Sequence, residues 1–185
     1  MVQNKNIELD IILTLIKGES HLREISRNIG ESHSTVLRKI NELVKDNILD
    51  YKQEGKNKIF FIKNNLKSKN YVYSAEIYKL NKLLKKHPKL SILFEEIKKN
   101  FKKGIIILFG SYAKGNKKND SDIDIYLETA DNKIKNKIKE INSKLSIKIG
   151  EFDTNSLLIK EIIKNHVILR GVEEYYERNN FFKET

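Results

Sequence analysis

A chain of 185 residues is long enough for one ordinary domain or two small ones, and its 39% hydrophobic share can fill a core. It has no cysteine, which excludes disulfides, and no apolar run of the about eighteen residues that span a membrane, so we expect a soluble cytoplasmic protein without a membrane partner. The net charge of +11 lies almost entirely in residues 1–103, a distribution typical of a part that meets a polyanion, but also of lysines that only solvate helix faces.

Three helices are predicted in the first seventy residues from apolar side chains at helical spacing. The first covers about residues 7–16 and precedes Gly18, a stop signal. Ser20 is expected to cap a second helix that ends at Gly30, and Ser32 a third that runs to about Asp46.

A β-hairpin is predicted next, with strands at residues 48–51 and 59–62 around a polar loop that contains Gly55. Three helices and a hairpin are the parts of a winged helix-turn-helix. Residues 1–70 also resemble the winged-helix domains of prokaryotic transcription regulators, down to the run N-E-L-V-K-D-N-I-L at the end of the third helix.

Such a domain inserts the start of its third helix into the major groove, and the hairpin loop contacts the phosphate backbone. The side chains expected to meet double-stranded DNA are therefore polar or basic groups on these two segments: Ser32, His33, Ser34, Thr35, Arg38, Lys39, Lys56 and Lys58. The alternative for this domain is a role in protein contacts or dimerisation alone.

Two further amphipathic helices follow. The first ends at His87-Pro88, where proline interrupts the helix, and the second covers about residues 90–101. We expect a winged-helix domain at 1–70, a connecting helix at 71–88 and a second domain at 89–185. The connecting helix is a candidate dimer contact, so a homodimer is left open.

The second domain carries an acidic strand beside a glycine corner. Residues 105–109 are apolar throughout, as in a strand buried on both faces, and lead directly into Gly110-Ser111. Residues 122–128 alternate, which places Asp122 and Asp124 on one face of a strand. Two carboxylates so close favour binding of a divalent cation, and a Gly-Ser corner can receive a phosphate, so the pattern indicates chemistry at phosphorus.

Gly110-Ser111, ten residues and then Asp122-x-Asp124 resemble the motif of the DNA polymerase beta superfamily of nucleotidyltransferases. The fuller run F-G-S-Y-A-K-G is similar to that of the minimal nucleotidyltransferases, with Lys114 where their arginine usually lies. The fold class expected is therefore α+β, a winged helix-turn-helix followed by a small mixed-sheet nucleotidyltransferase domain with flanking helices.

The resemblance implies the chemistry of this site. Gly110, Ser111 and Lys114 would bind a nucleoside triphosphate, with ATP the expected nucleotide, and Asp122 and Asp124 would bind Mg²⁺, usually two ions. A hydroxyl would attack the α-phosphorus and release pyrophosphate. Many minimal nucleotidyltransferases are antitoxins that transfer AMP to a tyrosine of a HEPN-type toxin, so such a toxin is a candidate acceptor.

The third carboxylate of this superfamily has no clear counterpart. It would come from the strand predicted at residues 145–152, where alternation directs Ser146 and Lys148 toward the site. Glu151 is the first candidate, provided that a bulge at Gly150 reverses the register, and Asp153 is the second, although it is expected more simply to cap the last long helix. His166 and residues 173–176 are expected on a surface helix.

Two other functions stay open for this sequence. One is a transcription regulator whose transferase fold only senses nucleotide, without catalysis. The other is a scaffold that makes no contact with DNA.

Overall fold

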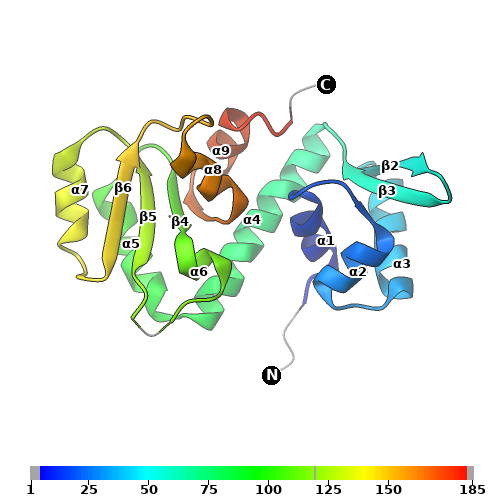
Figure 1. Ribbon diagram of the computed structural model, residues 1–185, viewed down its shortest axis with the longest axis horizontal. Coiled ribbons are helices and arrows are strands. Elements are labelled where there is room, and N and C mark those ends of the chain that lie inside the picture. Colours follow the sequence, from blue (N-terminus) through cyan, green and yellow to red (C-terminus); the bar gives the residue numbers. More distant parts are fainter. Residues whose placement is uncertain (1–4, 119, 183–185) are drawn as a thin grey trace. The chain divides into compact units, whose positions relative to one another are not determined.

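The computed structural model describes residues 5–118 and 120–182, which form two compact units that divide after Tyr78 (Figure 1). The division falls within helix α4 (Leu66–Lys86), which therefore belongs to both. The predicted limits at residues 70 and 88 stay a prediction. No helix among the described residues combines the length and the apolar character needed to cross a bilayer.

Three helices, the first part of α4 and a small antiparallel sheet make up the N-terminal unit. The sheet has the order β1-β3-β2, and its last two strands form a hairpin that turns at Gly55 and Lys56. In chain order the elements before α4 are α1 (Ile7–Leu15), β1 (Ser20–His21), α2 (Leu22–Ile29), α3 (His33–Lys45), β2 (Leu49–Glu54) and β3 (Asn57–Ile62).

Two of the predicted helix boundaries in this unit are confirmed and one is wrong. Ser32 caps α3, since its hydroxyl accepts a hydrogen bond from the Thr35 N–H at 3.2 Å, and Gly30 ends α2 with a φ of 66°. Ser20 does not cap α2. It lies in β1, paired with Phe60, and its hydroxyl donates to Glu24 at 2.7 Å instead.

The core of this unit consists of the apolar faces of its helices packed with the inner residues of the sheet. Buried side chains recur every three or four residues along α1 and α3, as the helical period requires. The most deeply buried are Ile11, Ile12, Ile25, Val36, Ile40, Leu43, Ile48 and Leu49.

The C-terminal unit is built on a four-stranded mixed sheet with the order β6-β5-β4-β7. Strands β5 and β6 run parallel, whereas β4 is antiparallel to both β5 and β7. After α4 the elements are α5 (Lys89–Asn100), β4 (Ile106–Phe109), α6 (Gly110–Lys114), β5 (Ile123–Glu128), α7 (Asn132–Lys139), β6 (Leu145–Gly150), α8 (Leu157–Lys164), β7 (Val167–Arg170) and α9 (Val172–Arg178). The predicted α+β class and mixed sheet are confirmed for this unit.

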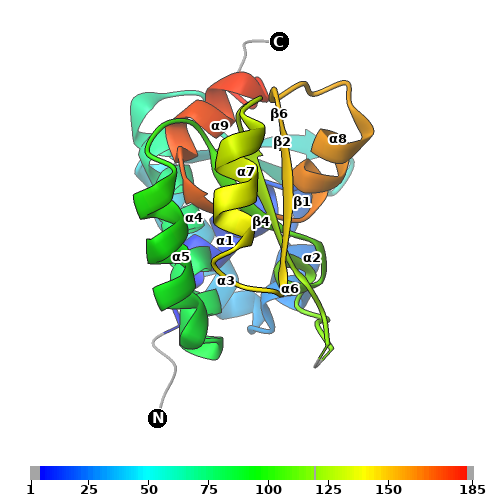
Figure 2. The same cartoon turned by 90° about the vertical axis from the view of Figure 1, so that its left-hand side faces the viewer.

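The two faces of this sheet have different covers. Helices α5 and α7 lie side by side on one face, and α8 lies on the other (Figure 2). The first face holds the main core, in which Phe94 and Ile97 of α5 and Ile138 of α7 pack on alternate strand residues such as Ile125. Because strand side chains alternate, Asp124 and Tyr126 point to the second face, under α8 and α9.

The end of the chain is packed more tightly than the sequence indicates. Residues 173–176 lie in helix α9 with Glu173 and Glu174 exposed, as expected, but Tyr175 and Tyr176 are 1% exposed and stack edge-on at 5.2 Å. His166 is buried and lies between α8 and β7 in the sequence, so its expected place on a surface helix is wrong. Asp153 does not cap α8 either. Ser156 does so, accepting from the Ile159 N–H at 3.2 Å, and the register of the helix leaves Leu157 85% exposed.

Candidate functional site

The glycine corner and the acidic strand meet through strand pairing. Phe109, the last residue of β4, pairs with Asp124 of β5, so Gly110 lies directly against the Asp124 side chain. A Cβ atom on Gly110 would overlap Asp124 Oδ2 and lie 3.0 Å from Cγ, and the φ of 68° is itself unfavourable for other residues. Two independent constraints therefore require glycine here, and both hold the first half of the sequence motif against the second.

The two aspartates differ in exposure. Asp122 is exposed just before β5, and Asp124 is half-buried within the strand, two residues further on. Burial raises the pKa of Asp124; a hydrogen bond with Ser146 lowers this pKa and the charge of Asp122 raises it. Because the ionised Asp124 is destabilised by burial and by Asp122, a cation bound here would stabilise its charged form.

Strand β6 adds Ser146 and Lys148 to the site. In the parallel register Ser146 pairs with Asp124 and Lys148 with Tyr126, which puts both side chains on the face of Asp124. The ammonium of Lys148 lowers the pKa of Asp124, a smaller effect than those of burial, Ser146 and Asp122. The predicted orientation of this strand, with Leu145 and Ile147 in the core, is confirmed.

One acidic neighbour of Asp124 was missed by the sequence reasoning. Glu161 of α8 acts on Asp124 through its charge, raising the pKa of that carboxyl, and forms an ion pair with Lys114 of α6 at 3.1 Å. No local pattern could have revealed it, because Glu161 follows Lys114 by 47 residues and comes near only when α8 packs on the sheet. Lys114, the predicted phosphate ligand, is thus held beside the site by a carboxylate.

The candidates for a third carboxylate lie at the other end of β6. Glu151 follows Ser146 by five residues, roughly 16 Å along an extended strand. Its charge instead acts on Tyr126, whose buried hydroxyl donates to the Gly150 carbonyl at 2.9 Å and has a pKa raised to about 12, chiefly by burial. Asp153 accepts from the Asn155 N–H in the following turn. The structure brings neither acid to Asp122 and Asp124.

The two aspartates fit a divalent cation, since carboxylate oxygens are ligands that Mg²⁺ prefers. Within the described ranges, however, no three side chains of histidine, cysteine, aspartate or glutamate gather closely enough to hold a metal ion. The site therefore offers Asp122 and Asp124 as its acidic ligands, and the Ser146 hydroxyl beside them.

The predicted DNA-contacting residues of α3 lie around its first turns. His33 and Ser34 are exposed, while the Ser32 hydroxyl is shared between the cap and Thr35 Oγ1 at 2.9 Å. The Arg38 guanidinium is exposed and pairs with Glu42 one turn further on, at 3.0 Å. These groups, except the capping hydroxyl, are accessible to a ligand.

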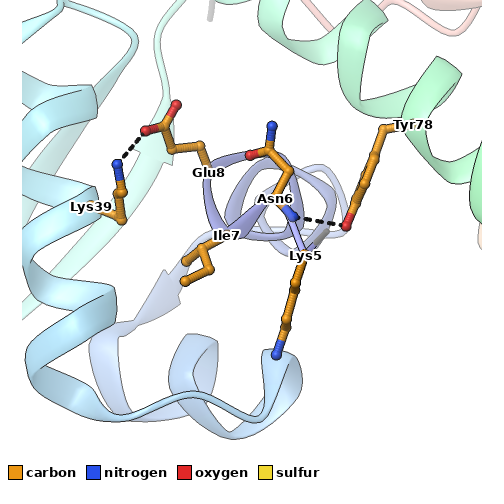
Figure 3. A pocket seen from close by; sticks show the side chains of 6 residues that line it. All are labelled: Lys5, Asn6, Ile7, Glu8, Lys39 and Tyr78. Carbon is orange, nitrogen blue, oxygen red and sulfur yellow. Dashed lines mark hydrogen bonds and ion pairs between the residues drawn. The ribbon is translucent and has the colours of Figure 1, made fainter. Parts of the chain in front are cut away.

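Lys39 points away from this group. Its ammonium donates to Glu8 of α1 and to Glu42, both at 2.7 Å, and these bonds raise the pKa of Lys39, the Glu42 bond most. Figure 3 shows this side chain directed at Glu8, in a pocket of about 490 Å³ that Asn6 and Tyr78 also line. Lys39 is thus held by two carboxylates and partly enclosed, whereas Arg38 has one carboxylate partner and stays exposed.

A basic groove lies between α2 and the hairpin. It has a volume of about 550 Å³, and the predicted residues Lys56 and Lys58 line it together with basic side chains that the sequence reasoning did not name: His21, Arg23 and Arg27. Leu37 of α3 lies at its border, and the ammonium of Lys58 also sits 3.8 Å from the centre of the Tyr51 ring. The exposed start of α2 could have suggested these positions, since phosphates are often bound there.

Residues 92–174 match the model of the family described as Polymerase beta, Nucleotidyltransferase. The matched segment begins in α5, ends in α9 and includes Gly110, Asp122 and Asp124. A search of curated proteins found no match to the chain. Fold, site and match together support a nucleotidyltransferase domain in the C-terminal unit.

Proposed function

We propose that the C-terminal unit transfers a nucleoside monophosphate from a nucleoside triphosphate, with ATP the expected donor, to a hydroxyl acceptor. The observation that carries this proposal is the contact of Gly110 with the Asp124 carboxylate, within the segment that matches the nucleotidyltransferase family. In the reaction the acceptor hydroxyl loses its proton and bonds to the α-phosphorus, while the bond to the departing pyrophosphate breaks.

In this proposal one group of residues binds the triphosphate and another binds the cation. Gly110 lets the backbone approach a phosphate closely, and Ser111 and Lys114 supply a hydroxyl and a charge for the triphosphate. Asp122 and Asp124 would hold Mg²⁺, which when bound supplies neutralisation of the phosphate charge. The protein's own contribution is to position and orient these groups, since phosphoryl transfer requires little covalent chemistry from its side chains.

The acceptor proposed is a tyrosine hydroxyl on a partner toxin of the HEPN type. This proposal is supported only by the resemblance to minimal nucleotidyltransferases. A DNA-binding domain in the same chain would suit an antitoxin that controls its own transcription.

The N-terminal unit is proposed to be a winged helix-turn-helix that binds double-stranded DNA. Its order of three helices and an antiparallel hairpin supports this, as does the basic groove beside α3. In this proposal α3 enters the major groove with His33, Ser34 and Arg38, and Lys56 and Lys58 contact phosphates.

A second candidate function is favoured by strand β6. The resemblance implies a third carboxylate from a neighbouring strand, but β6 presents Ser146 and Lys148, and no carboxylate, on the face of Asp124. A regulator that binds nucleotide without turning it over would be consistent with this arrangement.

The test of the proposed reaction uses ATP labelled at the α-phosphate. The protein, with Mg²⁺ and a candidate acceptor, is expected to transfer label, and Asp122→Ala with Asp124→Ala is expected to abolish the transfer. Glu95→Ala with Glu140→Ala removes the same charge from exposed positions in α5 and just after α7 and should leave transfer unchanged. Transfer that persists in the Asp122 and Asp124 double variant would refute this site. Nucleotide-dependent DNA affinity without pyrophosphate release would select the regulator.

A further inference from the structure

The site contains a basic side chain where its chemistry leads one to expect an acidic one. Lys148 lies on the same face of the sheet as Asp124, one strand away and two residues beyond Ser146, which pairs with Asp124 directly. The side chain is exposed, and its charge acts on the Asp124 carboxyl strongly enough to lower the pKa of that group. Lys148 is therefore electrostatically part of the aspartate pair.

The ammonium of Lys148 is available to a ligand. Lys114, the other lysine at the site, is held by Glu161 at 3.1 Å. By contrast, no hydrogen bond or ion pair joins Lys148 to another group in the described part of the chain. An exposed, uncommitted ammonium next to two carboxylates can bind a phosphate oxygen that a cation on those carboxylates brings close.

Strand β6 offers no carboxylate for a second metal ion, and Glu161 of α8, which acts on Asp124 through its charge, is paired with Lys114 at 3.1 Å. Asp122 and Asp124 suffice for one divalent cation, and residues 5–118 and 120–182 contain no cluster of three metal-binding side chains. A second cation between Asp124 and β6 would stand next to the Lys148 ammonium, where like charges repel. Two divalent ions and this lysine are thus competing ways to neutralise the same phosphates.

We propose that Lys148 is a fixed cation of the nucleotide site, so that the triphosphate is bound by its ammonium and a single divalent ion instead of two. The proposal rests on nucleotide binding at this corner, as in the proposed function, but not on catalysis. It assigns a phosphate-binding role to a residue of β6 and differs from the two metal ions that the resemblance implies.

The experiment counts ions and measures nucleotide affinity without any turnover. The probes are Mn²⁺ and α,β-methylene ATP, an analogue that resists cleavage at the reacting bond. Electron paramagnetic resonance of free Mn²⁺ gives the number of ions bound per protein at saturating analogue, and calorimetry gives the analogue's dissociation constant. We expect one Mn²⁺ per chain.

Three variants separate charge from folding. Lys148→Met keeps most of the length without the charge and is expected to weaken analogue binding about tenfold, the effect of losing one charge-assisted hydrogen bond. Lys148→Arg keeps the charge and should bind within about threefold of the unaltered protein. Lys139→Met removes a lysine from the exposed side of α7 and should change nothing. Exposure of Lys148 means that all three variants should fold.

The outcomes distinguish this inference from the proposed function. Two Mn²⁺ per chain, or unchanged analogue affinity in Lys148→Met, would overturn the role of Lys148 while leaving nucleotide binding intact. Failure of the unaltered protein to bind the analogue with Mn²⁺ would overturn both.

Discussion

Gly110 shows how a single residue can be fixed by conformation and contact together. Its φ of 68° and its contact with the Asp124 carboxylate each exclude a side chain. Most glycines of this protein with positive φ face open space, for example Gly30 and Gly55, so a Cβ atom there meets nothing. The corner at Gly110 thus has no room for a side chain, because it lies against the Asp124 carboxylate that the proposed reaction requires.

We predict that Gly110→Ala loses nucleotide binding and also destabilises the protein by about 1–3 kcal/mol, since the backbone strain and the overlap with Asp124 must both be relieved. Calorimetry with Mg-ATP and thermal unfolding measure the two effects. Gly55→Ala has a similar φ of 58° but no neighbour, so it is the control for backbone strain alone. Normal nucleotide affinity in Gly110→Ala would contradict the assigned corner.

The ionised Asp124 carboxylate is expected to destabilise the folded protein, although the proposed function requires it. Its pKa is raised in the folded protein, so protonation favours folding at low pH and that contribution is lost as pH rises through the folded pKa. Without divalent cations, Asp124→Asn should therefore unfold at a higher temperature than the unaltered protein at pH 7, by on the order of a few degrees or less. The difference should vanish near pH 3.

Thermal unfolding with and without Mg²⁺ checks this prediction for Asp124. The ion should raise the melting temperature of the unaltered protein and leave Asp124→Asn unchanged, because only the carboxylate binds it. A lower melting temperature for Asp124→Asn at pH 7 would show that the charge at this position does not destabilise the folded protein.

At the scale of elements, α3 presents two neighbouring basic residues with different partners. Arg38 is exposed beside Glu42, whereas Lys39 is enclosed by Glu8 and Glu42. We predict that Arg38→Ala weakens binding to duplex DNA and reduces its salt dependence by about one ion, while Lys39→Ala has the smaller effect on binding. Fluorescence anisotropy at several salt concentrations measures both. The reverse order would mean that α3 does not face DNA as proposed.

The loop between α5 and β4 depends on Arg170 of β7. Its guanidinium donates to the carbonyls of Gly104 at 3.1 Å and Lys103 at 2.8 Å, and also to that of Phe101. Lysine cannot reach three carbonyls with one ammonium, so Arg170→Lys should cost about 1–3 kcal/mol in urea unfolding. Arg27→Lys, on the exposed side of α2, is the matched control and should lie within about 0.5 kcal/mol of the unaltered protein.

How well an element could be predicted depended on how local its determinants are. The alternation of β5 and β6 indicated correctly that Ser146 and Lys148 face the site, because strand period is a local property. The cap at Ser20 was wrong because a two-residue strand, invisible in apolar periodicity, competes for that residue. The burial of Tyr175 was missed because it depends on contacts with Phe152 and His166, which lie outside helix α9 and do not contribute to its apolar periodicity.

On the scale of the whole molecule, the net charge does not divide as the fold does. Residues 1–78 have a net charge of +3 and residues 79–182 of +8, because the lysines of the second half of α4 and of α5 belong to the C-terminal unit. The expectation of a polyanion at the N-terminal unit therefore rests on its basic groove between α2 and the hairpin and not on net charge. The motif at Gly110, Asp122 and Asp124 could be predicted from sequence, whereas Glu161 could not, since its place follows from the packing of α8.

The most direct measurement of the central claim is a crystal structure with Mn²⁺ and α,β-methylene ATP, using the anomalous scattering of manganese. The account predicts manganese bound between Asp122 and Asp124, with the triphosphate along Gly110 and Ser111. Manganese and nucleotide bound elsewhere on the chain, with these two carboxylates free of both, would contradict it.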